Sequence, residues 1–155
     1  MVVSQGAIMK TPLCLRCKIV LSLMFISFLI FRQASSAGGL PESEAITGIN
    51  WAWQFTRNSS GNDITPPTPS RYTINFKNNG TFDIQADCNW GGGTYTIEEN
   101  FITVKITHTT KAMCPPDSLE QTFIQHLNSS KRFYFIDDNL HVELKGDSGT
   151  MKLGE

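Results

Sequence analysis

The sequence predicts a mainly β (α+β) domain, in which a small antiparallel, barrel-like sheet of about eight strands has one helix packed against it. Short stretches of alternating apolar and polar residues recur from Trp51 to Leu153, and a period of two is typical of half-buried strands. Glycine, proline and asparagine clusters separate these stretches at short intervals, as expected for an antiparallel barrel. A single stretch, after Pro115 and Pro116, instead shows apolar residues at helical spacing.

Residues 1–37 are predicted to be a secretory signal peptide and not part of the fold. Basic residues precede an apolar run at 19–31, and small residues follow it up to Ala37, which is the pattern of a signal cleaved after that alanine. Met9 is an alternative start of translation. Because the apolar run is shorter than the roughly 20 residues of a membrane-spanning helix, an uncleaved membrane anchor is the second interpretation.

Removal of the signal leaves 118 residues, which is enough for one domain with its own core. All fourteen acidic residues remain but only nine of the thirteen basic ones, so the net charge of the mature chain is near −5. A nucleic-acid partner is not expected, because such partners call for a basic surface. We interpret residues 38–47 as a flexible leader and residues 48–155 as the β domain, which we expect to be a monomer.

The first three strands follow from alternation and turn residues. Residues 51–55 alternate aromatic with smaller side chains, which predicts a strand with one aromatic face. The loop 56–70 contains prolines that cannot continue a ladder. Two alternating stretches, 72–76 and 82–86, then flank Asn79-Gly80, which is the strongest short signal for an antiparallel hairpin.

Gly91–Gly93 form the most unusual stretch of the domain. Three glycines predict a sharp bend or bulge where a sheet folds over itself, or the close approach of another backbone. Strands are expected to follow at 94–97 and 101–107. A phosphate-binding loop is the weaker alternative, since a strand and not a helix comes after the glycines.

The helix is predicted to begin at Asp117, because Glu120 three residues later completes a capping box. Its apolar side chains recur on one face that must be buried: Leu119, Phe123, Ile124 and Leu127. Further strands are expected at 133–136, 140–144 and 151–153. The first of these is apolar on both faces, as expected for a strand between the barrel interior and a covering helix or loop.

Cys88 and Cys114 are the two cysteines that remain after removal of the signal, which takes Cys14 and Cys17 with it. In an exported domain a disulfide between them is the default, and two free buried thiols are the alternative. We expect a secreted, periplasmic or envelope protein, with membrane anchoring through residues 1–37 as the alternative location.

Several short motifs together resemble the META domain (HslJ-like) family over roughly residues 46–153. The most specific are the Cys88-Asn89 pair with Gly93-Thr94-Tyr95, and the stretch Thr109–Cys114; the other matching positions are Trp51, Tyr72–Phe76, Asn79–Thr81, Glu120, Phe123 and Leu140. The resemblance implies a small barrel-like sheet with one helix, found in exported or envelope-associated bacterial proteins. Some members are linked to stress responses or antibiotic resistance, and no established enzymatic activity comes with the family. The chain lacks the lipid-attachment cysteine of many members.

No catalytic constellation stands out in the sequence. His108, His126 and His141 lack the short spacings of a metal site, and no serine lies in a nucleophile elbow. We therefore predict that the protein is not an enzyme and has neither a catalytic metal nor another cofactor.

Two groups of residues are candidates for a binding function. Polar and aromatic residues that flank the predicted disulfide could form a binding rim at the end of the barrel: Asp87, Asn89, Trp90, Thr109 and Thr110. The favoured interpretation of the polar ones, however, is that they bond bends of the backbone. A candidate apolar interior is formed by Trp51, Trp53, Phe82, Phe133 and Phe135.

The function hypothesis is an exported, non-catalytic binding or envelope stress and maintenance module, whose partner is a protein or an apolar ligand. A carrier of a small lipid in the barrel is one alternative. Another is a peptidase inhibitor, in which the loop 56–70 or the Gly91–Gly93 turn enters a protease cleft, since a rigid loop binds at low entropic cost.

Overall fold

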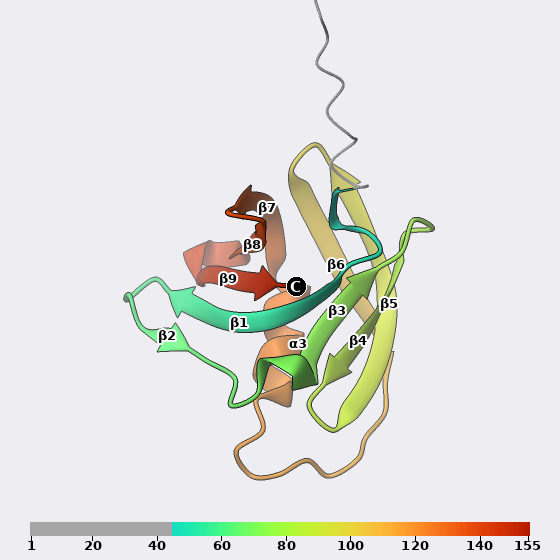
Figure 1. Ribbon diagram of the computed structural model, residues 1–155, viewed down its shortest axis with the longest axis vertical. Helices are drawn as coiled ribbons and strands as arrows, with labels where there is room; N and C mark the ends of the chain where they lie inside the picture. Colours follow the sequence, from blue (N-terminus) through green and yellow to red (C-terminus); the bar gives the residue numbers. More distant parts are fainter. Residues whose placement is uncertain (1–44) are drawn as a thin grey trace, which may run out of the picture. The chain divides into compact units, whose positions relative to one another are not determined.

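The computed structural model describes residues 45–155, and within this range the fold is nine strands and one α-helix (Figure 1). The elements in chain order are β1 (Asn50–Asn58), β2 (Asp63–Ile64), the 3-10 turn η1 (Pro69–Arg71), β3 (Tyr72–Phe76), β4 (Thr81–Ala86), β5 (Asn89–Glu98), β6 (Phe101–Thr109), α3 (Glu120–Asn128), β7 (Ser130–Ile136), β8 (Asn139–Leu144), the 3-10 turn η2 (Lys145–Asp147) and β9 (Gly149–Gly154). The predicted fold class is therefore confirmed.

The strands form one antiparallel sheet that closes on itself. Its order is β2-β1-β3-β4-β5-β6-β7-β8-β9, and β1 also pairs with β9. The β1–β9 ladder extends from Ala52 opposite Gly154 to Asn58 opposite Gly149. Because β2 is only two residues long, the ring itself consists of the other eight strands.

The ring has one weak seam, between β6 and β7. These strands share a single register pair, Phe101 opposite Arg132, whereas β5 and β6 share eight. Residues 110–119 connect β6 to α3 and pass the end of the sheet, as Figure 1 shows. The helix lies beside β6, and the Asn128 side chain accepts a hydrogen bond from the backbone N–H of Ile106 at 3.2 Å.

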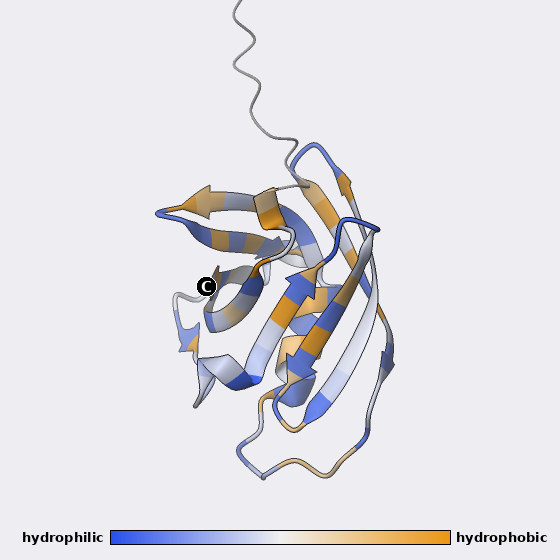
Figure 2. Ribbon diagram, turned by 45° about the vertical axis from the view of Figure 1, so that its right-hand side comes forward, coloured by the Kyte–Doolittle hydropathy of each residue, from blue (hydrophilic) through white to orange (hydrophobic). Residues whose placement is uncertain are grey.

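Aromatic rings fill the interior of the barrel. Trp51, Trp53, Phe82 and Phe133 are all almost completely buried, as predicted for the apolar interior. The Trp53 ring stacks on Phe123 of α3 with 5.5 Å between centroids. Figure 2 shows the alternation of hydrophobic and hydrophilic residues along the strands that produces this core.

Phe135 is a correction to the predicted interior, because 41 % of its surface is exposed. It is the next-to-last residue of β7, two positions before the turn residue Asp137. Its ring still contacts Trp51, with 6.1 Å between centroids. The residue therefore covers the mouth of the barrel, and the neighbouring Ile136 is half exposed in the same way.

The predicted leader 38–47 ends earlier than expected. Ile46 is completely buried in the core, and its carbonyl accepts a hydrogen bond from the Trp51 indole N–H at 2.9 Å. An apolar side chain and an indole partner hold this segment against the barrel. The remaining residues of the leader, 38–44, and the predicted signal peptide 1–37 lie outside the described residues.

Two further expectations about the chain between residues 89 and 120 are wrong in detail. The glycines do not precede a strand but lie inside β5, with a bulge between Gly92 and Gly93. A Cβ atom on Gly93 would collide with the Lys105 carbonyl oxygen of β6, so close backbone approach is the reason for glycine here. The helix begins at Glu120, without a side-chain cap from Asp117.

Candidate functional site

The Cys88–Cys114 disulfide is present, with 2.05 Å between the sulfur atoms and 5.5 Å between the Cα atoms. Cys88 lies in the tight turn between β4 and β5, and Cys114 lies in the long connection between β6 and α3. The bond therefore fixes this connection to the end of the sheet. Disulfides of this kind are typical of oxidising compartments, such as the periplasm or the extracellular space.

Asn89 fixes the same connection through its side-chain amide, which is almost completely buried. Its Oδ1 atom accepts hydrogen bonds from the Thr110 hydroxyl and from the Ala112 N–H, both at 2.7 Å. Its Nδ2 atom donates to the Ala112 carbonyl at 3.0 Å. Asn89 and Thr110 thus bond the backbone bend, which is the favoured sequence interpretation of these side chains.

The other members of the predicted rim separate into two groups. Asp87 is buried and forms an ion pair with Arg71, in a turn where its backbone has φ of 61°. Trp90 is 59 % exposed, and its backbone N–H donates to the Thr110 hydroxyl. Asp87 therefore has a structural role at the turn, whereas Trp90 presents its ring to solvent.

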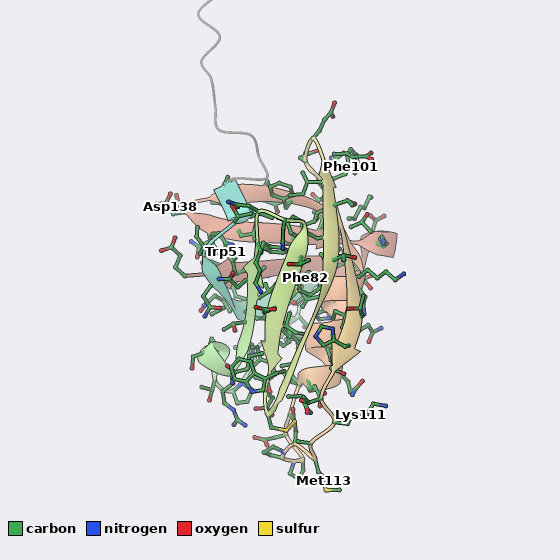
Figure 3. All side chains as sticks on the ribbon, turned by 90° about the vertical axis from the view of Figure 1, so that its right-hand side faces the viewer. Trp51, Phe82, Phe101, Lys111, Met113 and Asp138 are labelled. Atoms are coloured by element: carbon green, nitrogen blue, oxygen red, sulfur yellow. A yellow bond between two sulfur atoms is a disulfide. The ribbon has the colours of Figure 1, made fainter. Side chains whose placement is uncertain are left out.

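Asn89, Thr109 and Thr110 do come together along a hollow in the surface, a groove of about 830 Å³ between the end of β6 and α3. We call it the β6–α3 groove. The β6 wall continues into Lys111 and Ala112, and the helix wall consists of Glu120, Gln121, Ile124 and Asn128. Figure 3 places Lys111 and Met113 at the end of the barrel opposite Phe101. The volume of the groove is within the range of ligand sites.

Polar side chains dominate the walls of the groove, and its floor is apolar. Ile106 and Ile124 are partly buried and pack against the core. His108 and Lys111 are exposed on the β6 side, and Glu120 stands on the helix side. Positive and negative groups therefore face each other across the groove, with no excess of either sign.

The helix wall of this groove was not foreseen from the sequence. Gln121, Ile124 and Asn128 are three and four residues apart, so they share one face of α3. That spacing could have indicated a second, more polar face beside the buried one of Phe123 and Leu127. The sequence does not show that this face lies opposite β6. The helix can lie beside β6 because β6 shares a single register pair with β7.

The histidines lie in separate environments. His108 lines the β6–α3 groove, while His141 stacks on Tyr134 of β7. His126 is half-buried beside Trp53, and burial lowers its pKa. Its Nδ1 atom lies 3.1 Å from the Thr56 hydroxyl. Among residues 45–155, no three His, Cys, Asp or Glu side chains gather as a metal ion would require.

This geometry affects the two alternative hypotheses, a lipid carrier and a peptidase inhibitor, in different ways. At the centre of the barrel, where a lipid would lie, Trp53, Tyr72 and Phe123 are in mutual ring contact. The glycine run, one of the two segments expected to enter a protease, is an internal part of β5. The predicted loop 56–70 is partly strand, because β1 extends to Asn58 and pairs with β2 at Asp63–Ile64, where Arg57 and Asp63 also form an ion pair. Its role as an inhibitor stays a prediction.

The sequence matches the model of the META domain family over residues 44–153. The chain belongs to the META domain family. This match covers the whole ring of strands and α3, so the resemblance predicted from the motifs is confirmed. No curated protein matches the sequence significantly.

Two solved structures share the fold of this META domain. One is the NMR structure of a protein from Burkholderia xenovorans, with a TM-score of 0.59 and 14 % identity over 72 % of this chain and 84 % of that one. The other is the crystal structure of a DUF4847 family protein from Bacteroides vulgatus, with a TM-score of 0.52 and 17 % identity over 75 % of this chain and 96 % of that one. At these identities the similarity concerns the fold alone. Within the described residues, the META domain contains no helix long and apolar enough to cross a membrane.

Proposed function

We propose that this META domain is an exported, non-catalytic binding module that acts in envelope stress or maintenance and holds its partner in the β6–α3 groove. The observation that carries the proposal is the way in which one wall of the groove is built. The disulfide and the buried Asn89 amide together fix residues 110–114 against the sheet. A wall that is already ordered loses little entropy when a partner binds.

Export is supported by two independent features. The predicted signal peptide 1–37 has a cleavage pattern that ends at Ala37, and the disulfide suits an oxidising compartment. Mass spectrometry of the protein purified from producing cells tests this directly. A mature chain that begins at Gly38 is the expected result, and an intact amino terminus recovered from the membrane fraction would support the anchored alternative.

The binding site is tested with a matched pair of variants on α3. Gln121 lines the groove, whereas Gln125 is exposed on the same helix but does not line it. Gln121→Trp should fill the groove and abolish capture of a partner from envelope extract, and Gln125→Trp should leave capture unchanged. Equal capture by both variants and the wild type would place binding elsewhere, and no capture by the wild type would contradict the binding module.

A further inference from the structure

The β6 wall of the groove is a strand edge that lacks a neighbouring strand along most of its length. On one side β6 pairs with β5 from Phe101 to Thr109. On the other side, within the described residues, only Phe101 has a register partner, Arg132 of β7. An edge of this kind can accept an additional strand from another chain.

The register shows which backbone groups face the groove. The Thr110 N–H donates to the Trp90 carbonyl of β5 at 2.8 Å. Hydrogen-bonding groups of successive residues point alternately to the two sides of an antiparallel strand. The N–H and C=O of Thr109 are therefore directed away from β5, to the side where the groove lies.

The groove is closed at one end and open at the other. At the closed end, the Asn128 side chain of α3 accepts the hydrogen bond from the Ile106 N–H, in the position of a strand's carbonyl. Toward Thr109 and Lys111, the opposite wall is Gln121 and Glu120, and no such bond joins β6 to the helix there. The open end thus leaves room beside Thr109, above the apolar floor of Ile106 and Ile124.

We propose that the β6–α3 groove takes an extended polypeptide segment, which adds to β6 as a further strand beside Thr109. This inference rests on the proposed function and names the chemical class of its partner. Every second side chain of the added strand faces the floor, so the segment has an apolar residue at alternate positions. The balanced charges of Lys111 and Glu120, together with the acidic mature chain, favour a polypeptide over an anionic lipid headgroup.

The first experiment uses an immobilised array of decapeptides of randomised sequence and the mature, disulfide-bonded protein. Peptides with alternating apolar residues are expected to bind. N-methylation of the best binder, one residue at a time, should weaken binding at least tenfold at every second position and leave the positions between nearly unchanged. Uniform tolerance of N-methylation would overturn strand addition, as would an array without binders.

The second experiment changes the edge itself. Thr109→Pro removes the N–H that faces the groove, at a position where an edge strand tolerates proline, and Thr109→Val keeps this N–H. Binding of the selected peptide should fall at least tenfold in the first variant and less than threefold in the second. The melting temperature and the β-sheet circular dichroism of each variant show whether the fold is intact, and the N-methyl scan needs no variant at all.

The outcomes separate this inference from the proposed function. If Gln121→Trp abolishes binding but Thr109→Pro does not, the groove binds its partner without strand addition. If neither variant affects binding, both the groove and the added strand are wrong. Phosphatidylglycerol vesicles and a second copy of the protein serve as competitors, and displacement of the peptide by vesicles alone would point to a lipid site instead.

Discussion

The barrel is held together differently on its two sides. Where β1 meets β9, six register pairs form a ladder with one irregularity, between Trp53 and Phe55. Where β6 meets β7, one pair remains, and α3 lies beside β6, with the Asn128 side chain bonded to the Ile106 N–H. Phe123 and Leu127 of this helix are almost fully buried in the core. Backbone pairing therefore closes the β1–β9 side, whereas at the β6–β7 side a helix lies beside the strand edge. Only the second arrangement leaves a strand edge and a helix face that together form a groove.

The largest effect is expected from removal of the packing between α3 and the aromatic core. Phe123 is completely buried between Trp53 and Tyr72, so Phe123→Ala should lower the free energy of unfolding by about 3–5 kcal/mol. Urea denaturation measures this loss. Phe101→Ala, at the single β6–β7 pair but 44 % exposed, should cost about 1 kcal/mol or less. Equal losses would mean that the exposed β6–β7 pair stabilises the barrel as much as the buried helix contact does.

Removal of the disulfide is expected to lower the free energy of unfolding by a similar but slightly smaller amount. Its loop spans 26 positions, and the chain-entropy relation gives a contribution of about 3.5 kcal/mol. The double variant Cys88→Ala/Cys114→Ala should therefore unfold at lower urea concentration. Amide exchange should accelerate first in residues 110–114, before the β1–β9 ladder opens. Simultaneous acceleration in both regions would show that the two sides are not separate units.

A medium effect on stability is expected in β5, the strand that pairs with β6 along the length of β6. Gly93 lies so close to Lys105 and Phe82 that an added Cβ atom would collide with both, so Gly93→Ala should cost about 1–3 kcal/mol. Thr94→Ala is the control, because Thr94 is the next residue of β5 and is exposed. Thermal unfolding measures both variants. A Gly93→Ala protein as stable as the control would mean that β6 shifts readily, which would weaken the proposed edge.

The smallest effect is a dependence of stability on pH that arises where α3 meets β1. The Trp53 indole donates to the Thr56 hydroxyl at 2.9 Å, and the same hydroxyl lies 3.1 Å from Nδ1 of His126. Burial lowers the pKa of His126. The unfolded chain therefore binds more protons, and stability should fall as the pH drops below about 6.5, the ordinary histidine value.

Urea midpoints at pH 8 and pH 5 test this dependence. His126→Gln should flatten the difference between the two midpoints. His141 also has a pKa lowered by burial, with a smaller contribution from Lys152 that Asp137 opposes, so His141→Gln should remove only its own part. An unchanged difference in the His126→Gln protein would contradict burial of His126 as a source of the pH dependence.

Much of the fold could be predicted because it depends on local patterns. The alternation in 72–76 and 82–86 correctly places Ile74 and Ile84 in the core, and the Asn79-Gly80 signal marks the hairpin between them. Only Gly80 of that pair has positive φ, because the connection between the strands is four residues long and not two. The Cys88–Cys114 disulfide likewise agrees with the prediction made from the two cysteines that follow the predicted signal peptide.

The rest depended on contacts between distant residues. Ile46 resembles leader sequence, but its side chain joins the core because the next residues are held against β3, with Thr47 bridged to Phe76 and the Gly48 N–H bonded to the Phe76 carbonyl. Phe135 has the composition of a core residue but lies where β7 extends past the end of the β5–β6 hairpin. The candidate site shows the same limit. Asn89 and Thr110 were predicted from their positions beside the disulfide. The helix wall of Gln121 and Ile124 could not be predicted, because it depends on β7 pairing with β6 at one position alone.

The β1–β9 ladder also sets the order in which the chain can fold. Trp53 pairs with Leu153, so the ring joins its earliest strand to its last and cannot be completed until residue 153 has left the ribosome. Contacts this distant in sequence form slowly, and the nascent domain stays open throughout its synthesis. An unclosed chain also suits the export proposed above, because an open chain can pass through a narrow channel. Ribosome-stalled chains that lack residues 149–154 should accordingly be digested by protease, whereas the released protein should resist.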